Sequence, residues 1–421
     1  MALSRQLPLE PLEPPDRLRG QAPRLGELPG DGRSFRPHTF ADRLADPRRQ
    51  HLLELGAGLR QRLGLGADAL ERRLRGPIDV RLRDREPRTG PLDRPLVHGG
   101  QGYRWRRMNL RELDYELPAE LIAQAPAERR DESRLLVYER ETGAVAHRRF
   151  SELPDELHRG ELVVVNDSRV IPARLLVRRP GGGEAEVLLL EPLGGGGLWE
   201  GLARPSRRLR AGQRLGPVEL LEALGGGRWR LRLEGEPEGE LPLPPYITGP
   251  VPDPTRYQTV YARTPGSAAA PTAGLHFTPE LLERLDVERV TLHVGLDTFR
   301  PVAVDELEEH AIHGERYEVS PRAWERIRRS PRVLAVGTTT VRVLESIAGG
   351  APLRGRTELF ITPGFRFRRV DALLTNFHLP RSTLLALVMA FAGVEETRAL
   401  YRLAIAERYQ FYSFGDALLI R

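Results

Sequence analysis

Histidines gather in one part of this chain, among residue types that suit proton transfer and ligand binding. Five of the ten lie between positions 270 and 380: His276, His293, His310, His313 and His378. Histidine gains and loses a proton near neutral pH, so this stretch is the first place to expect acid–base chemistry. It opens on the segment 270–277 (APTAGLHF), whose small residues would let the backbone approach a ligand closely. A tight turn that leads into a helix explains the same residues, so both interpretations stay open.

The turn 336–340 (VGTTT) offers a second kind of site. It places free backbone amides and two or three hydroxyls at the start of an expected helix, an arrangement that suits a carboxylate or a phosphate. Ordinary capping of the helix by Thr338 and Thr339 is the alternative. The glycines of a dinucleotide-binding fingerprint and the lysine of a Walker loop are missing, so neither of those nucleotide sites is expected.

His310, His313 and Glu315 have a spacing that a zinc ion could use. The segment that follows, 316–319, is strand-like, which argues against one continuous helical face of ligands. The His-Glu-x-x-His pattern of zinc proteases is also absent. We therefore expect a hydrogen-bonding or acid–base pair of histidines here, and no metal site. No Gly-x-Ser-x-Gly elbow is present, which argues against a serine hydrolase.

The composition removes several reaction classes. The chain has no cysteine, which excludes disulfides, thiolate metal ligands and cysteine nucleophiles. All 64 basic residues are arginine, so Schiff-base chemistry on lysine is excluded as well. At 421 residues the chain is long enough for two or three domains with a sizeable core.

The positive charge is concentrated at the N-terminal end. Residues 1–107 carry 22 arginines against 14 acidic residues, whereas residues 108–421 carry 42 against 44. A nucleic-acid surface in the main body must therefore be a local patch. The first residues lack an apolar signal segment, and the longest apolar run, 384–394, is shorter than the ~20 residues that span a bilayer. These features predict a cytoplasmic protein with no membrane partner.

Residues 1–107 form an Arg/Pro/Gly-rich extension with little periodicity, and we expect it to be disordered. The composition changes at Met108, one of only three methionines, and a normal globular pattern begins at Asn109. We infer that translation starts at Met108, and that residues 1–107 are upstream read-through or a dispensable extension.

From this point the pattern alternates between strands and helices, which predicts an α/β domain with a parallel or mixed sheet. Strands are expected at 134–138, 161–166, 290–294, 333–336 and 417–420. Helices are expected at 118–124, after Thr278, and at 321–329, 338–345, 383–392 and 394–407. Ligands collect at the carboxyl ends of strands in such sheets, where we expect four of the polar residues: His276, His293, Thr338 and His378.

A different pattern interrupts this domain between residues 174 and 245. Short strands are separated by glycine clusters, and 229–233 (WRLRL) alternates between apolar and charged residues. We expect a small all-β barrel, inserted between two parts of the α/β domain at 108–173 and 246–421. Its segment 204–210 (RPSRRLR) is the best basic patch of the main body, although a solvated charged turn explains it as well.

Residues 108–421 resemble the S-adenosylmethionine:tRNA ribosyltransferase-isomerase family of queuosine biosynthesis. The resemblance rests on nine blocks in the family's order: 166–175 (NDSRVIPARL), 243–247 (LPPYI), 256–262 (RYQTVYA), 270–278 (APTAGLHFT), 291–295 (TLHVG), 310–315 (HAIHGE), 336–346 (VGTTTVRVLES), 375–384 (TNFHLPRSTL) and 412–417 (YSFGDA). Each block alone is weak, but together they are highly specific. Residues 1–107 match nothing in the family.

The resemblance implies an α/β domain with an inserted β-barrel and no required metal. We also expect a monomer that needs no cofactor beyond its co-substrate. The resemblance also implies an activity: the ribosyl moiety of S-adenosylmethionine, a co-substrate, is transferred and isomerised onto 7-aminomethyl-7-deazaguanine at the wobble position of tRNA. The product is epoxyqueuosine, and adenine and methionine are released. The sulfonium acidifies the C5′ hydrogens, so a positioned base can remove one of them, and an acid helps adenine to leave.

The resemblance does not settle which residue performs which step. We expect His276, at a cleft between the domains, to act as base or acid, supported by His310, His313 and His378. Thr338 and Thr339 would hold the methionine carboxylate or a tRNA phosphate, and arginines would position the RNA backbone. Tyr257 or Phe277 would stack on a base from the anticodon loop. The expected substrate-binding residues are Asn166, Arg169, Arg174, Tyr257, Thr272, Phe277, His293, Thr338, Thr339, Arg342, Glu345 and Asn376.

Two other classes of protein use the same features. A non-catalytic RNA-binding protein on this scaffold would bind tRNA but release no adenine from S-adenosylmethionine. A metal-dependent hydrolase would use His310, His313 and Glu315, and metal analysis would exclude it.

Overall fold

The structure is a computed structural model that describes residues 109–249, 251, 253–295, 307, 312 and 314–421. The predictions for residues 1–107, including their disorder and a start at Met108, lie outside the described residues. The same holds for His310 and His313. Within the described residues, no helix has the length and apolar character needed to cross a membrane.

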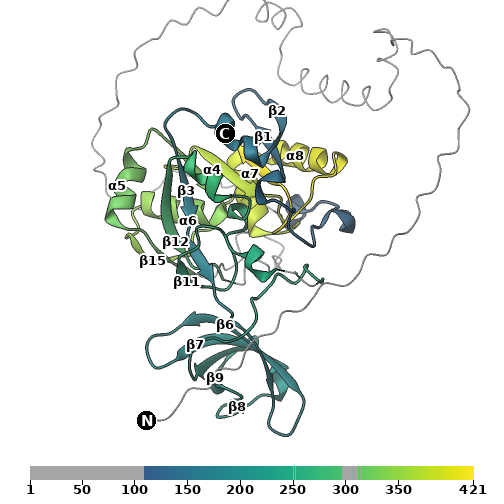
Figure 1. The fold of residues 1–421 in the computed structure, drawn as a ribbon, viewed down its shortest axis with the longest axis vertical. Coiled ribbons are helices and arrows are strands. Elements are labelled where there is room, and N and C mark those ends of the chain that lie inside the picture. The colour runs from purple at the N-terminus through teal and green to yellow at the C-terminus, as the bar shows by residue number, and fades with distance from the viewer. Residues whose placement is uncertain (1–108, 250, 252, 296–306, 308–311, 313) are drawn as a thin grey trace, which may run out of the picture. The chain divides into compact units, whose positions relative to one another are not determined.

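The main domain is built on a mixed nine-stranded sheet (Figure 1). Its centre is parallel, because β12, β3, β14 and β16 run the same way, whereas β17 is antiparallel to β16. The edge strands pair antiparallel with their neighbours. The order across the sheet is β15 (Arg354–Thr357), β13 (Glu315–Glu318), β12 (Val287–Leu292), β3 (Glu161–Asn166), β14 (Arg332–Val336), β16 (Ala372–Asn376), β17 (Ala417–Ile420), β1 (Arg134–Tyr138) and β2 (Val145–Arg149).

Both faces of this sheet are covered, as the continuous apolar runs in its central strands require. Alternate residues of β3 point to opposite faces: Leu162 and Val164 belong to one core cluster, and Val163 and Val165 to the other. The first cluster includes α5 (Pro321–Arg329), α6 (Thr338–Ala348), α7 (Thr383–Ala392) and α8 (Val394–Ala406). The second includes α3 (Leu153–Glu156), α4 (Pro279–Glu283) and the loop that contains Phe277.

A second, antiparallel sheet has six strands, all of which lie between residues 174 and 233. Its strands, in order across the sheet, are β5 (Arg174–Arg178), β6 (Glu184–Pro192), β7 (Leu198–Arg204), β10 (Arg228–Leu233), β9 (Val218–Gly225) and β8 (Arg214–Leu215). The sheet is nearly closed, since a Cβ placed on Gly216 after β8 would lie 3.5 Å from Val177 of β5. The alternation expected at 229–233 is confirmed, because Trp229, Leu231 and Leu233 are buried and the arginines between them are exposed. A short parallel pair, β4 (Ser168–Val170) with β11 (Thr264–Ser267), lies at the join.

Most element predictions are confirmed. The strands at 134–138, 161–166 and 417–420 and the helix at 321–329 have the expected bounds. Thr278 and Ser382 cap α4 and α7 through their side chains, as predicted. Two expectations were wrong: 118–124 contains only a 3₁₀ turn, Ala119–Leu121, and Gly337, not a threonine, is the N-cap of α6. Gly337 has φ +83°, which an L-residue adopts with strain, so the chain turns there and Thr338 is already helical.

Candidate functional site

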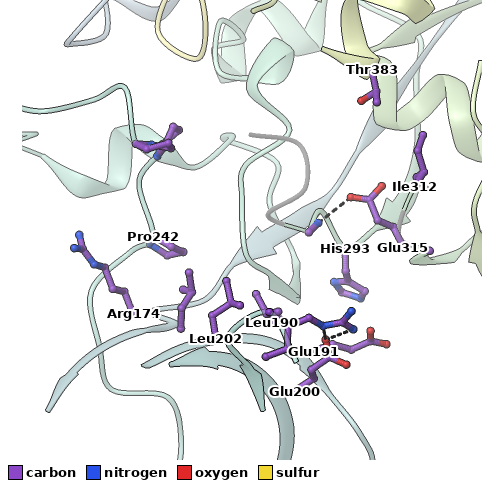
Figure 2. A pocket seen from close by; sticks show the side chains of 18 of the residues that line it. Arg174, Leu190, Glu191, Glu200, Leu202, Pro242, His293, Ile312, Glu315 and Thr383 are labelled. Atoms are coloured by element: carbon purple, nitrogen blue, oxygen red, sulfur yellow. Dashed lines mark hydrogen bonds and ion pairs between the residues drawn. The ribbon is translucent and has the colours of Figure 1, made fainter. Parts of the chain in front are cut away.

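The six-stranded sheet and the main domain together line a cavity of about 1390 Å³, called the large cavity below (Figure 2). Residues of β6, β7 and β10 contribute from the six-stranded sheet. The rest of the lining includes residues of the 242–249 segment, Gly266, His293 and residues 314–316. Three of the residues expected to bind substrate line it: Arg174, His293 and Arg342.

Charged side chains in this cavity form pairs across short distances. Arg174 lies 3.2 Å from Glu186, and Arg228 lies 2.5 Å from Glu200. Glu191 of β6 forms ion pairs with two arginines of the main domain, Arg316 at 3.1 Å and Arg356 at 2.5 Å. The large cavity can therefore offer arginines to a substrate carboxylate or phosphate, and glutamates to a substrate cation.

The most buried of these pairs joins Arg342 of α6 to Glu315 of β13, with side chains only 11% and 10% exposed. The guanidinium also donates to the carbonyls of Leu359 and Thr357, each at 3.0 Å. The other carboxylate oxygen of Glu315 accepts from the backbone amide of Gly295 at 2.8 Å. Each charge thus has several partners, which a buried ion pair needs to offset its desolvation.

His293 follows the last residue of β12 and is half-buried. Its backbone amide donates to the carbonyl of Arg316 at 2.9 Å. This hydrogen bond holds the backbone from which the imidazole extends. Nδ1 is buried and has no hydrogen-bond partner among the described residues. The ring packs on Gly266, where an added Cβ would lie 3.0 Å from Cε1 and Nδ1. Burial, and then the nearby charge of Arg316, lower the pKa of His293, so its imidazole is neutral at pH 7.

The segment 270–277 lies elsewhere, among the carboxyl ends of the central strands. Its residues are buried, except for the half-buried Thr272. A Cβ on Gly274 would lie 1.8 Å from the Tyr261 hydroxyl oxygen and 2.9 Å from Thr259, so the small residue admits these side chains. The segment therefore forms a packed plug at the carboxyl ends of the central strands, and it does not line the large cavity.

His276 belongs to this plug and is 4% exposed. Its Nδ1 lies 2.7 Å from Ser133 Oγ, and Asn376 Nδ2 donates to its Nε2 at 3.3 Å. The ring stacks on Phe150 with centroids 4.9 Å apart. Burial, and then the charge of Arg130, lower its pKa to about 4. The cavity that His276 lines measures only about 20 Å³.

Several of the expected binding residues lie near His276, at the carboxyl ends of the central strands. Thr272 donates its hydroxyl to Asn376 Oδ1 at 3.0 Å, which sets the amide so that its nitrogen faces His276. Asn166 exchanges hydrogen bonds with the backbone of Leu292 and donates weakly to Thr339 Oγ1 at 3.4 Å. Thr338 and Thr339 are buried at the start of α6. The carboxyl ends of the strands thus hold two sets of hydrogen-bonded polar side chains inside a packed region, one around Asn376 and one around Asn166.

The remaining predicted residues do not line the large cavity and form no hydrogen bond with the His276 ring. His378 is buried, its Nε2 lies 2.7 Å from Thr375 Oγ1, and burial lowers its pKa to about 3. Glu345 accepts three backbone amides of residues 368–370. Tyr257 and Phe277 are fully buried against Phe414 and Phe150, with no open ring face in this structure. Arg169 is exposed on β4.

Sequence reasoning missed most of the charged lining of the large cavity: Glu186, Glu191, Glu200, Arg228, Glu315 as an arginine partner, Arg316 and Arg356. In the sequence these residues occupy the polar positions of alternating strands, where solvent-facing side chains are the usual interpretation. Only Gly266, beside the proline of a short Thr-Pro-Gly segment, carried a local signal of close approach. Among the described residues, no group of three His, Cys, Asp or Glu side chains could hold a metal ion.

Comparison with known proteins gives a consistent picture. The family model described as "Queuosine biosynthesis protein" matches residues 110–420. The chain is 54% identical to the S-adenosylmethionine:tRNA ribosyltransferase-isomerase of Rubrobacter xylanophilus, over 74% of this chain and 98% of that protein. It is 51% identical to the protein of the same name from Moorella thermoacetica, over 74% and 100%. A solved S-adenosylmethionine tRNA ribosyltransferase from Thermotoga maritima is 40% identical and covers 74% of this chain and 100% of that one, with a TM-score of 0.44.

Proposed function

The chain belongs to the S-adenosylmethionine:tRNA ribosyltransferase-isomerase family of queuosine biosynthesis, and we propose that the large cavity binds its substrates. The enzyme transfers and isomerises the ribosyl moiety of S-adenosylmethionine onto 7-aminomethyl-7-deazaguanine at the wobble position of tRNA. Epoxyqueuosine forms, and adenine and methionine leave. The observation that carries this function is the match to relatives at 50–54% identity over nearly their whole length.

The size and charge of the large cavity support its assignment as the substrate site. Its volume of about 1390 Å³ exceeds the roughly 300–1,000 Å³ of a site for one small molecule. This leaves room for S-adenosylmethionine and for one nucleotide splayed out of the tRNA. Arg174 and Arg342 suit the methionine carboxylate or a phosphate, while glutamates such as Glu191 suit the ammonium and aminomethyl groups.

The RNA backbone would continue from the rim of the large cavity over the six-stranded sheet. Arg204 lines the cavity, and Arg207, Arg208 and Arg210 are exposed just beyond it. Exposed arginines in a row neutralise phosphates without reading sequence, which fits recognition of a tRNA loop by position. Arg169, exposed on β4, would add one further phosphate contact.

His276 remains a proposed base or acid, with His378 in support and His310 and His313 outside the described residues. Burial lowers the pKa of His276 to about 4, so its imidazole is neutral at pH 7. A substrate would have to displace Ser133 or Asn376 from the ring to reach it. Adenine release by His276→Ala tests this role: a wild-type rate would remove His276 from catalysis.

Domain division and setting are also proposals. The bounds of the two large sheets support a discontinuous α/β domain at 108–173 and 246–421 with an inserted barrel at 174–245. We propose that the enzyme acts as a cytoplasmic monomer, needs no cofactor beyond its co-substrate, and has tRNA as its macromolecular partner.

Nucleoside mass spectrometry tests the function directly. The purified protein is incubated with S-adenosylmethionine and tRNA that carries 7-aminomethyl-7-deazaguanine, and the digested tRNA is then analysed. Epoxyqueuosine should appear in equal amount with free adenine and methionine. Binding of the tRNA without any release of adenine would contradict the assignment.

A further inference from the structure

Three observations single out His293 among the groups that could move a proton in the large cavity. Its titratable lining, among the described residues, consists of four glutamates, six arginines and His293. Each of the four glutamates already lies in an ion pair with an arginine. His293 is thus the one neutral titratable side chain in this part of the lining.

The ring of His293 is held in place but not engaged by hydrogen bonds. Neither ring nitrogen has a hydrogen-bond partner among the described residues. Nδ1 is buried against Gly266, which leaves Nε2 as the nitrogen that a bound molecule can reach. By contrast, His276 and His378 have partners on their rings and do not line the large cavity.

We infer that His293 is the catalytic base of the reaction and accepts the C5′ proton of S-adenosylmethionine at Nε2. This inference rests on the proposed function and on the large cavity as the substrate site. In the step, the C5′–H bond breaks, an N–H bond forms at Nε2, and the electron pair stays on C5′ beside the sulfonium. The imidazolium that results faces Glu191, whose carboxylate lies in the same lining and stabilises the positive charge.

Gly266 is the positioning residue for this base. Its φ of +132° suits glycine, and a Cβ there would lie 3.0 Å from two atoms of the imidazole. An alanine at this position would push the ring away from its present place. Gly266 thus lets its backbone lie close to the imidazole of His293, the base itself.

Single-turnover release of adenine, with saturating S-adenosylmethionine and modified tRNA, tests the inference on the full chain. His293→Ala should lower the rate constant by about 10²–10⁴-fold, the usual contribution of a general base. The KM for S-adenosylmethionine should change much less. Added imidazole should restore part of the rate, because the large cavity has room for it. His158→Ala, at an exposed histidine outside the cavity, is the matched control and should behave as wild type.

The outcomes separate the inference from the proposed function. If wild-type protein releases no adenine, the proposed function itself is wrong. If wild-type protein is active and His293→Ala keeps its rate, or folds normally but is not rescued by imidazole, His293 is not the base. Should His293→Ala fail to fold, His293→Gln replaces it, and an unchanged rate constant there overturns the inference.

A second pair of variants tests the positioning role. Gly266→Ala should lower kcat, with little change in the KM for S-adenosylmethionine, and imidazole should not restore it because the histidine is still present. The control is Gly355→Ala in β15, where a Cβ would meet its nearest neighbour, a Pro352 carbon, at an ordinary 3.6 Å. Equal kcat values for the two variants would remove Gly266 from this role.

Discussion

His276 and His293 both lie beside the parallel centre of the sheet, but their rings differ in their hydrogen-bond partners. In the plug at the carboxyl ends of the strands, both ring nitrogens of His276 have partners, Ser133 and Asn376, and the ring stacks on Phe150. In the large cavity, the ring of His293 packs on Gly266 and forms no hydrogen bond to a described residue. Satisfied polar groups stabilise a fold, whereas a group left without a partner beside a large cavity is available to a substrate.

The glycines beside the two histidines show the same difference. Gly274 makes room for Tyr261 inside the plug, and Gly266 makes room for the imidazole of His293 at the cavity wall. One small residue therefore completes a core, and the other places a reactive side chain. A motif rich in small residues indicates close approach, but only the fold tells what approaches.

The largest expected effect concerns the buried pair that supports the cavity wall. Arg342→Leu leaves Glu315 charged and buried, and should lower the free energy of unfolding by about 3–5 kcal/mol. The double variant Arg342→Leu/Glu315→Leu should recover much of that loss, because no unpaired charge remains. Urea unfolding of both variants measures this. A single variant within about 1 kcal/mol of wild type would mean that the pair is not buried in solution.

The next effect tests the structural side of the comparison. His276→Leu removes the ring stack and leaves Ser133 and Asn376 without their partner, so the free energy of unfolding should fall by about 2–4 kcal/mol. His293→Leu should cost much less stability, since that ring has no hydrogen-bond partners to lose. Thermal and urea unfolding compare the two. If the two variants lose equal free energy of unfolding, the hydrogen bonds of the His276 ring do not stabilise the fold.

Much of the main sheet could be predicted from the sequence, because its signals are local. Buried runs such as 161–166 and caps such as Ser382 depend on residues close in the chain. The lining of the large cavity could be predicted only in part. His293 and Arg342 were expected to bind substrate, but Glu191 meets Arg316 and Arg356 only because the six-stranded sheet folds against the main domain. Such long-range pairs leave no periodic pattern in the sequence.

The pH dependence of stability gives a smaller effect per histidine and per pH unit, at His276 and His378. Burial lowers the pKa of His276 to about 4 and that of His378 to about 3, from an ordinary value of 6.5. The unfolded chain therefore binds these protons first, and stability falls as the pH drops from about 6.5 toward the folded pKa values. The slope approaches about 1.4 kcal/mol per pH unit for each histidine. Urea unfolding between pH 7 and pH 4 measures it, and His378→Leu should flatten the curve.

The smallest effect is a shift in the pH profile of catalysis, and it sharpens the cavity side of the comparison. Four charged groups act on His293: Arg316 lowers its pKa, while Asp167, Glu191 and Glu318 raise it. As the base, His293 must be deprotonated, so kcat/KM should fall only below a pKa that lies under 6.5. Arg316→Gln removes the cation and also frees Glu191 from one partner, and both changes raise this pKa. The acid limb should therefore move to higher pH in Arg316→Gln and to lower pH in Glu318→Gln. If neither substitution moves the limb, the group that titrates in the profile is not His293.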